Sequence, residues 1–166
     1  MIALAVKPSP DEIRRWLEDV PDPEVPAVSI VDLGIVRDIE WRGDTLVVGV
    51  TPTYSGCPAT AVISIDIVEA LRRRGVERVR IETRLSPPWT TAWISDAGRE
   101  KLRAYGIAPP VEGAPCAGAL KPTAPVACPQ CGSSRTEEVS RFGSTPCKAT
   151  WRCADCLEPF DYFKSF

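Results

Sequence analysis

The sequence predicts an α+β protein: a small mixed three-stranded sheet with flanking helices, followed by a C-terminal all-β zinc ribbon. Helical and strand-like apolar patterns alternate through the first two thirds of the chain, a Pro- and Ala-rich stretch follows, and five of the seven cysteines cluster near the C-terminus. We therefore expect a first domain (residues 1–107), a linker (108–127) and the ribbon (128–166).

The first domain opens with a predicted helix and hairpin. Ser9-Pro10-Asp11-Glu12 is a capping box with proline at the first helical position, and apolar residues follow at helical spacing. Residues 30–41 and 45–50 are rich in β-branched residues and are separated by Arg42-Gly43-Asp44. This pattern predicts an antiparallel hairpin.

Two further helices and one strand complete this domain. A helix is expected to start near Pro58 and to end at Gly75, a natural residue just after a helix C-terminus. Residues 79–85 alternate apolar and charged side chains, as a half-buried strand does, and a last helix should run over about residues 95–105. The resulting order, α-β-β-α-β-α, favours a mixed sheet with helices on one face.

Composition excludes several classes of function. Twenty Lys and Arg against 22 Asp and Glu give a net charge of −2, which argues against a polycationic nucleic-acid or membrane-surface binder. No apolar run approaches the ~18 residues of a membrane span, and the N-terminus lacks the features of a signal peptide, so we expect a cytoplasmic protein. The chain has no histidine, which excludes Ser-His or Cys-His triads and histidine-containing di-iron sites.

The C-terminal cysteines form two C-x₂-C units, the pattern of a tetrahedral four-thiolate site. The predicted ligands are Cys128, Cys131, Cys153 and Cys156. Four thiolates leave no open position, so we expect one structural zinc per chain, although rubredoxin-like iron or an iron–sulfur cluster stays open. Removing Cys131 should unfold residues 125–166 and leave the first domain folded. Cys147, a fifth cysteine in the same region, is interpreted as a small buried residue, with alternate ligand or redox partner as the competing hypothesis.

Cys57 lies directly before Pro58, at the start of a predicted helix. The positive end of the helix dipole and free backbone N–H groups would stabilise a thiolate there. A buried structural cysteine is an equally good interpretation. Without histidine as a base, binding of a soft metal or cluster suits this thiol better than nucleophilic catalysis.

Four segments of the first domain resemble the signature of the SufT-like iron–sulfur assembly family. They are Asp22-Pro23-Glu24-Val25-Pro26, Ser29-Ile30-x-Asp32-Leu33-Gly34, Thr51-x-Thr53-x-x-x-Cys57-Pro58 and Pro88-Trp89-Thr90. The C-terminal stretch resembles the PaaD family of phenylacetate degradation proteins, components of the phenylacetyl-CoA epoxidase system. It carries Cys128-Pro129-x-Cys131-Gly132-Ser133, Phe142-Gly143-Ser144-Thr145-x-Cys147-Lys148-Ala149 and Glu158-Pro159-Phe160-Asp161-Tyr162-Phe163-Lys164.

The resemblance implies an accessory protein that assists maturation or repair of the iron–sulfur or di-iron centres of the epoxidase. Its partners would be the oxygenase and reductase components, and Cys57 would be the working thiol that transiently holds iron or a cluster. The resemblance places five residues around that thiol: Asp22, Glu24, Thr51, Thr53 and Trp89.

Two other functions stay open at this stage. The chain could be a non-catalytic docking adapter of the oxygenase, or a thiol enzyme acting on an acyl-CoA thioester. The sequence offers neither a nucleotide-binding Gly-rich loop nor a general base for the thioester enzyme. Both a monomer and a homodimer remain compatible with it.

Overall fold

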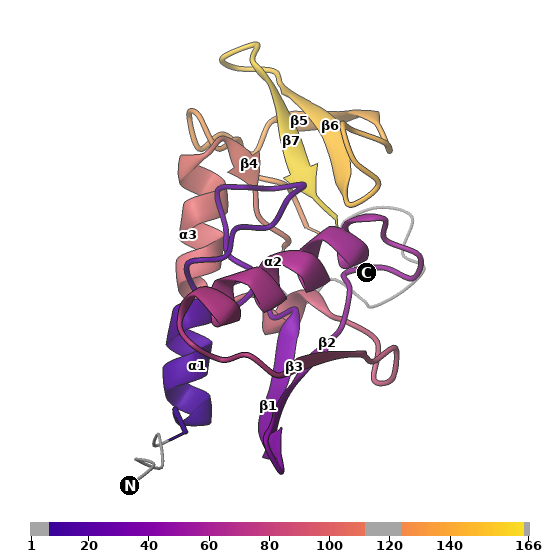
Figure 1. Cartoon of the computed structure of the whole chain (residues 1–166). Helices are drawn as coiled ribbons and strands as arrows, with labels where there is room; N and C mark the ends of the chain where they lie inside the picture. Colours follow the sequence, from indigo (N-terminus) through magenta and orange to yellow (C-terminus); the bar gives the residue numbers. More distant parts are fainter. Residues whose placement is uncertain (1–6, 112–123, 165–166) are drawn as a thin grey trace, which may run out of the picture.

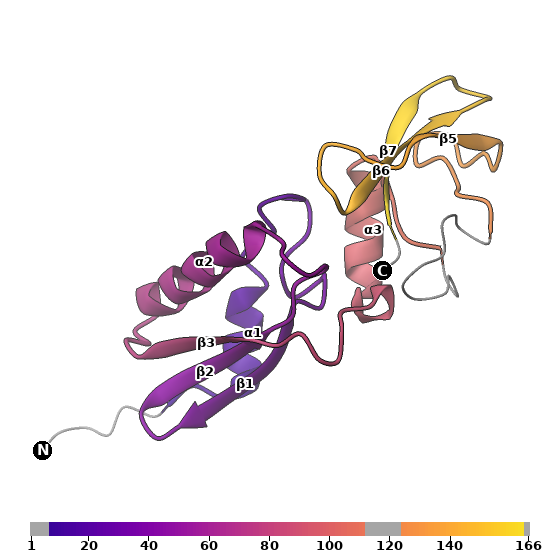
Figure 2. The same cartoon turned by 90° about the vertical axis from the view of Figure 1, so that its right-hand side faces the viewer.

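The computed structural model describes residues 7–111 and 124–164, which form two sheets and their covering helices (Figures 1 and 2). The elements are α1 (Pro10–Leu17), β1 (Val36–Arg42), β2 (Thr45–Val50), α2 (Ala59–Arg73), β3 (Val79–Thr83), a short 3₁₀ helix η1 (Thr91–Trp93), α3 (Asp96–Ala104), β4 (Ile107–Ala108), β5 (Thr136–Ser140), β6 (Lys148–Cys153) and β7 (Pro159–Phe163). These elements confirm the predicted α+β class. None of the helices in these two ranges is long and apolar enough to cross a membrane.

The first sheet has the order β1-β2-β3 and is mixed, as predicted, because β2 runs antiparallel to β1 and parallel to β3. Ion pairs between the outer strands, such as Arg42 with Glu82 and Arg84 with Asp38, mark the face that stays in water. The helices α1 and α2 supply buried apolar side chains to the core. These are Ile13, Leu17, Ile63, Ile67 and Leu71.

The predicted first strand, residues 30–41, is wrong over its first six residues. These residues are mostly buried, but they form tight turns, in which Leu33 N–H donates to Ser29 O (3.0 Å) and Gly34 N–H to Val31 O (2.9 Å). Gly34 has φ +69°, and a Cβ there would lie 2.5 Å from the carbonyl oxygen of Trp93. Glycine is therefore required, and β1 starts only at Val36.

The second sheet, of order β4-β7-β6-β5, takes one strand from the segment before the ribbon. β4 pairs in parallel with β7, with Ile107 opposite Asp161 and Ala108 opposite Tyr162. The sequence placed the linker from residue 108 to residue 127, and residues 112–123 of it lie outside the described parts. The flanking residues differ from a solvated linker, because Ala108 and Val126 are each 1% exposed in the apolar core of the ribbon.

The ribbon packs directly on the first domain. Phe163, 1% exposed, belongs to the core of the first domain, and its ring centroid lies 6.1 Å from that of Trp89. Cys147, 2% exposed, belongs to the same core. Figure 2 shows the ribbon against the end of α3, beyond the first sheet. A buried interface therefore joins the two parts of the molecule.

Candidate functional site: a four-cysteine centre and a small thiol cavity

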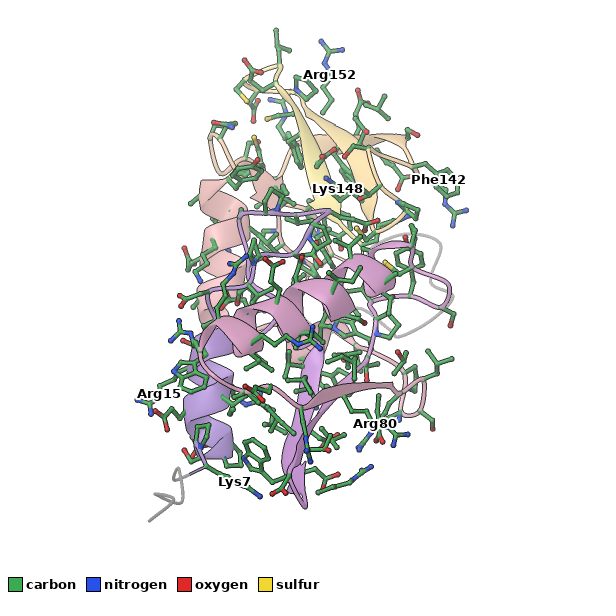
Figure 3. The ribbon with its side chains drawn as sticks, in the orientation of Figure 1. Lys7, Arg15, Arg80, Phe142, Lys148 and Arg152 are labelled. Atoms are coloured by element: carbon green, nitrogen blue, oxygen red, sulfur yellow. The ribbon has the colours of Figure 1, made fainter. Side chains whose placement is uncertain are left out.

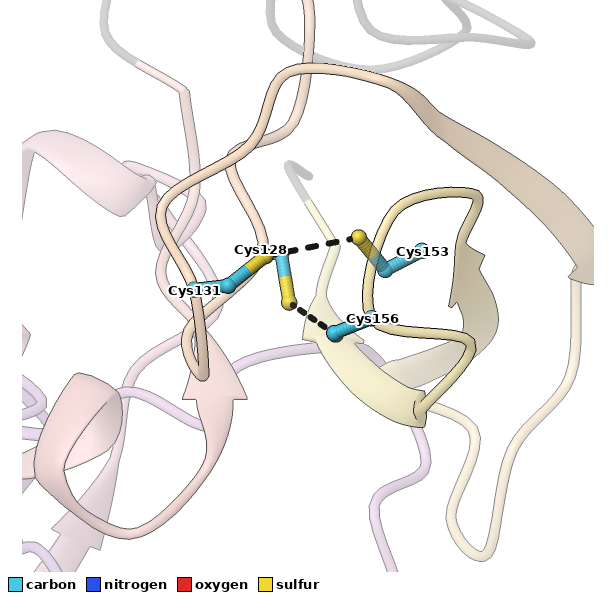
Figure 4. Close-up of side chains that lie close together, drawn as sticks. All are labelled: Cys128, Cys131, Cys153 and Cys156. Atoms are coloured by element: carbon cyan, nitrogen blue, oxygen red, sulfur yellow. Dashed lines mark hydrogen bonds between the residues drawn. The ribbon is translucent and has the colours of Figure 1, made fainter.

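The structure brings the four predicted ribbon ligands together (Figure 4). Their sulfur atoms all lie within 4.8 Å of one another, with Cys128 to Cys156 at 3.7 Å and Cys131 to Cys153 at 3.6 Å. Zn–S bonds of about 2.3 Å in a tetrahedron place sulfur atoms about 3.8 Å apart. The spacing therefore fits a four-coordinate zinc ion and supports a structural zinc.

Tight turns in the backbone hold these thiols in place. Gly132, at φ +77°, lets the first C-x₂-C unit fold back, so that its N–H donates to Cys128 O at 2.8 Å. In the second unit, a hydrogen bond from the backbone N–H of Cys156 lowers the pKa of the Cys153 thiol to about 7. A thiol that is easily deprotonated is a better zinc ligand.

Cys57 is half-buried at the end of the loop that leads into α2. Its N–H donates to Tyr54 O (3.3 Å), and its carbonyl accepts from the N–H of Thr60 (3.2 Å). Pro58 is the N-cap, so α2 starts at Ala59, one residue later than predicted. The cysteine therefore lies where the helix begins, as expected from the sequence.

A cavity of about 10 Å³ opens beside Cys57, at the junction of the first domain and the ribbon. This is space for roughly one water molecule. Its lining includes two acidic residues, a hydroxyl, two thiols and an aromatic ring. These residues are Asp22, Glu24, Thr53, Cys57, Cys147 and Phe163.

Three of the five residues predicted around Cys57, namely Asp22, Glu24 and Thr53, line this cavity. The other two lie outside its lining. Thr51 is buried, and its N–H donates to Ile35 O at 2.9 Å. Trp89 donates from Nε1 to Leu33 O at 2.8 Å and supports the cavity through its ring contact with Phe163.

Asp22 shapes the acidic loop. Its Oδ1 accepts the backbone N–H groups of Glu24 (2.9 Å) and Val25 (2.8 Å), which fixes the turn. Burial is the largest influence on this carboxyl group and raises its pKa despite those hydrogen bonds. Asp32, the third acidic residue of this region, lies in a separate cluster, where it binds Lys101 at 2.6 Å.

Cys147 is the site residue that the sequence did not place. Its Sγ lies 3.0 Å from Thr145 Oγ1 and 3.5 Å from Glu24 Oε2, a carboxylate of the first domain. Burial raises the pKa of this thiol to about 11, and the neighbouring Glu24 adds to the effect. The available signal was its position outside both C-x₂-C units, within the family-like segment of residues 142–149.

Tyr54 connects the groups around the cavity. Burial, followed by a hydrogen bond with Cys57, raises the pKa of its hydroxyl. The charges of Glu24 and Cys147 act on it in the same direction. The pKa of the Tyr54 hydroxyl therefore depends on both thiols and on the Glu24 carboxylate, which indicates that these groups interact electrostatically.

A larger cavity of about 710 Å³ lies at the other end of the first domain. Trp16 and Trp41 line it together with Lys7, which lies far from Lys148 of the ribbon in Figure 3. Its lining contains no cysteine, so the thiol chemistry of the described residues is confined to the small cavity and the ribbon centre.

Comparisons with known proteins match two separate regions of the chain. Residues 10–82 match the family model described as "Iron-sulfur cluster assembly protein", and residues 112–164 match "PaaD zinc beta ribbon domain". A curated protein of Escherichia coli (strain K12), named as one of the subunits of a "Putative 1,2-phenylacetyl-CoA epoxidase", is 47% identical over 163 residues, or 98% of this chain and 97% of the relative. A solved structure of a Domain of Unknown Function DUF59 from Bacillus anthracis is 29% identical, with a TM-score of 0.52 over 55% of this chain and 89% of that one. Cys57 lies in the first matched region and Cys147 in the second.

Proposed function

Because the chain belongs to the PaaD family of phenylacetyl-CoA epoxidase components, we propose that it assists the maturation or repair of metal centres in an epoxidase complex. Its clients would be the oxygenase and reductase components. Iron is the cargo, and Cys57 is the thiol that holds it. The zinc of the ribbon stays in place as a structural ion.

One observation carries this proposal: the Cys57 thiol shares a small cavity with two carboxyl groups and a second thiol, in a lining that is otherwise largely apolar. A cavity of about 10 Å³ suits an ion and excludes an enclosed organic substrate. No histidine is available as a general base anywhere in the sequence. These properties favour metal handling over chemistry on an acyl-CoA thioester.

The residues around the thiol have different roles: metal binding, positioning of a loop and packing. Cys57 binds the cargo through sulfur, and Asp22 holds the loop that presents the Glu24 carboxylate. Phe163 forms part of the apolar lining of the cavity, and Trp89 packs against its ring. A thiolate–iron bond is more durable in such a sheltered place than in bulk water.

The test is the metal content of the clients rather than that of this protein. The epoxidase components are produced together with wild-type protein, Cys57→Ser or the control Cys116→Ser, which replaces the cysteine of the predicted linker. Iron and acid-labile sulfide are then measured in each purified component. We expect Cys57→Ser to leave the clients metal-deficient and Cys116→Ser to match wild type. Fully loaded clients with Cys57→Ser would overturn the proposal.

A docking adapter is the second candidate, and exposed apolar side chains favour it. Phe142 is 71% exposed and projects from the ribbon in Figure 3, and Ile65 on α2 is 64% exposed. Large exposed apolar groups are typical of interaction surfaces. The adapter predicts that Phe142→Ala weakens association with the oxygenase while Cys57→Ser has no effect on client metals.

A further inference from the structure

We propose that Cys147 is a second metal-binding thiol, so that Cys57, Cys147 and the carboxylate of Glu24 together bind one Fe²⁺ ion between the first domain and the ribbon. This inference rests on the proposed role of Cys57 and extends it to a residue of the ribbon. The site is distinct from the four-cysteine centre, which uses none of these three residues.

The first support is geometric. Cys57 and Cys147 both line the cavity, although 90 residues of sequence separate positions 57 and 147. Cys147 approaches Glu24 Oε2 at 3.5 Å, and Glu24 lines the same space. Three potential ligand groups from three separate segments therefore face one small cavity.

The second support is the local balance of charge. Two carboxyl groups and two thiols line the cavity, and no cationic side chain is among its lining residues. The nearby cation, Lys148, is 7% exposed, lies 3.6 Å from Asp161 of β7 and partly offsets the charge at Asp22 and Cys147. Ionising the buried Cys147 thiol is costly without a further compensating charge, and a divalent cation that displaces its proton would supply that charge.

The chemistry of the ligands indicates which ion fits. Thiolates favour soft or borderline metals, and a carboxylate widens the choice to Fe²⁺. A set of two sulfurs and one carboxylate does not complete the coordination of Fe²⁺. The ribbon centre, by contrast, offers four thiols in a closed set. The cavity site is therefore suited to an ion that must leave again.

The ribbon also positions Cys147 beside the first domain. The N–H of Lys164 donates to Cys147 O (2.9 Å), and the N–H of Lys148 donates to Thr145 O (3.1 Å). These bonds fix Cys147 directly before β6, the strand that ends at the zinc ligand Cys153. The zinc fold thus holds the second thiol against the first domain.

The experiment is an anaerobic titration of zinc-loaded protein with Co²⁺, a spectroscopic substitute for Fe²⁺. Zinc binds thiolate sites more tightly than cobalt does, so the ribbon keeps its zinc during the titration. Wild type should bind one additional Co²⁺ with a sulfur-to-metal charge-transfer absorption. Cys57→Ser and Cys147→Ser should each weaken this binding by at least roughly 10- to 100-fold, the loss that even an outer-shell partner causes. Cys116→Ser is the matched control and should bind as wild type does.

Each outcome of the titration supports or refutes the proposed Fe²⁺ site. A zinc content of one per chain in every variant shows that the ribbon remains folded. If Cys147→Ser binds Co²⁺ like wild type while Cys57→Ser does not, the second thiol is refuted and the proposed role of Cys57 stands. A wild-type protein without charge-transfer absorption refutes the site itself. The role of Cys57 in client maturation is judged separately, by the metal content of the clients.

A second measurement needs no variant and covers the case in which Cys147→Ser fails to fold. Wild type is treated with iodoacetamide in the presence and absence of Fe²⁺, under partial denaturation that lets both thiols react in the free protein. Modified peptides are then quantified by mass spectrometry. Bound Fe²⁺ should protect Cys57 and Cys147 together. Protection of Cys57 alone would overturn the proposal.

Discussion

The two cysteine sites of this molecule are built in opposite ways. In the ribbon, four thiols come from two short turns of one small sheet and lie within 4.8 Å of one another. In the cavity, Cys57 and Cys147 come from different parts of the molecule and meet beside Glu24. A closed set of four sulfurs suits a permanent ion, whereas a partial set at an interface suits an ion in transit. The first site stabilises a fold, and the second depends on that fold.

Loss of the zinc site should have the largest effect. With Cys131→Ser the ribbon loses a stabilisation on the order of 10 kcal/mol, and residues 124–164 should become sensitive to protease. The first domain should keep its fold but lose the cover that Phe163 gives to Trp89, so hydrogen exchange at residues 89–94 should rise. Zinc content and limited proteolysis measure this directly. Unchanged digestion of the ribbon would contradict the assignment.

Phe163→Ala should weaken the contact between the ribbon and the first domain while both cysteine sites remain present. Truncating a buried aromatic side chain costs about 3–5 kcal/mol, and here the loss falls on the interface between ribbon and first domain. We expect a lower thermal midpoint and faster modification of Cys147, with zinc content kept at one. The matched control is Phe142→Ala, because that ring is 71% exposed and its loss should shift stability by less than about 0.5 kcal/mol. Equal midpoints for the two variants would show that the interface is not stabilising.

The two cavity thiols should differ in reactivity in the metal-free site. Cys57 is half-buried, whereas Cys147 is 2% exposed and has a pKa of about 11. Because the thiolate is the reactive form, very few Cys147 thiols are reactive at pH 7, and the fraction rises as pH approaches 11. Iodoacetamide should therefore label Cys57 faster at pH 7, with the gap closing at high pH. Peptide mapping over a pH series provides the measurement, and equal rates at pH 7 would be the contrary result.

The smallest expected effect comes from the carboxylate. Glu24→Gln keeps the size of the side chain but removes its charge, so the additional Co²⁺ should bind about 10-fold more weakly while the ribbon zinc is unaffected. Glu100→Gln serves as control, because Glu100 is 74% exposed and pairs with Arg103 on α3. Equal Co²⁺ affinity in the two variants would remove Glu24 from the proposed ligand set.

The features that could be predicted from the sequence are those specified by local residue patterns. The C-x₂-C spacing is a property of single turns, so the four ligands could be identified without knowledge of the fold. The period of apolar residues similarly located α1, α2 and β2 to within a few residues. The apolar run from residue 30 was interpreted as a strand because burial alone does not distinguish a strand from buried turns.

The parts that could not be predicted depend on tertiary contacts. Cys147 meets Glu24 across 123 residues of sequence, and no spacing rule reports such an encounter. The strand β4 has only two residues, too few to show a period. Thr51 and Trp89 came from the family resemblance, which identifies a pattern of residues without distinguishing those that line a cavity from those that support it.

The strand β4 determines what is exposed when the ribbon unfolds. It is a two-residue strand of the first part of the chain, and its partner β7 belongs to the ribbon. If the ribbon unfolds for want of zinc, β4 loses that partner and presents unpaired N–H and C=O groups next to newly uncovered Ala108. Such an open strand edge is a template for pairing with another chain. We therefore expect this protein to self-associate when zinc is scarce, so that its aggregation would depend on the supply of zinc.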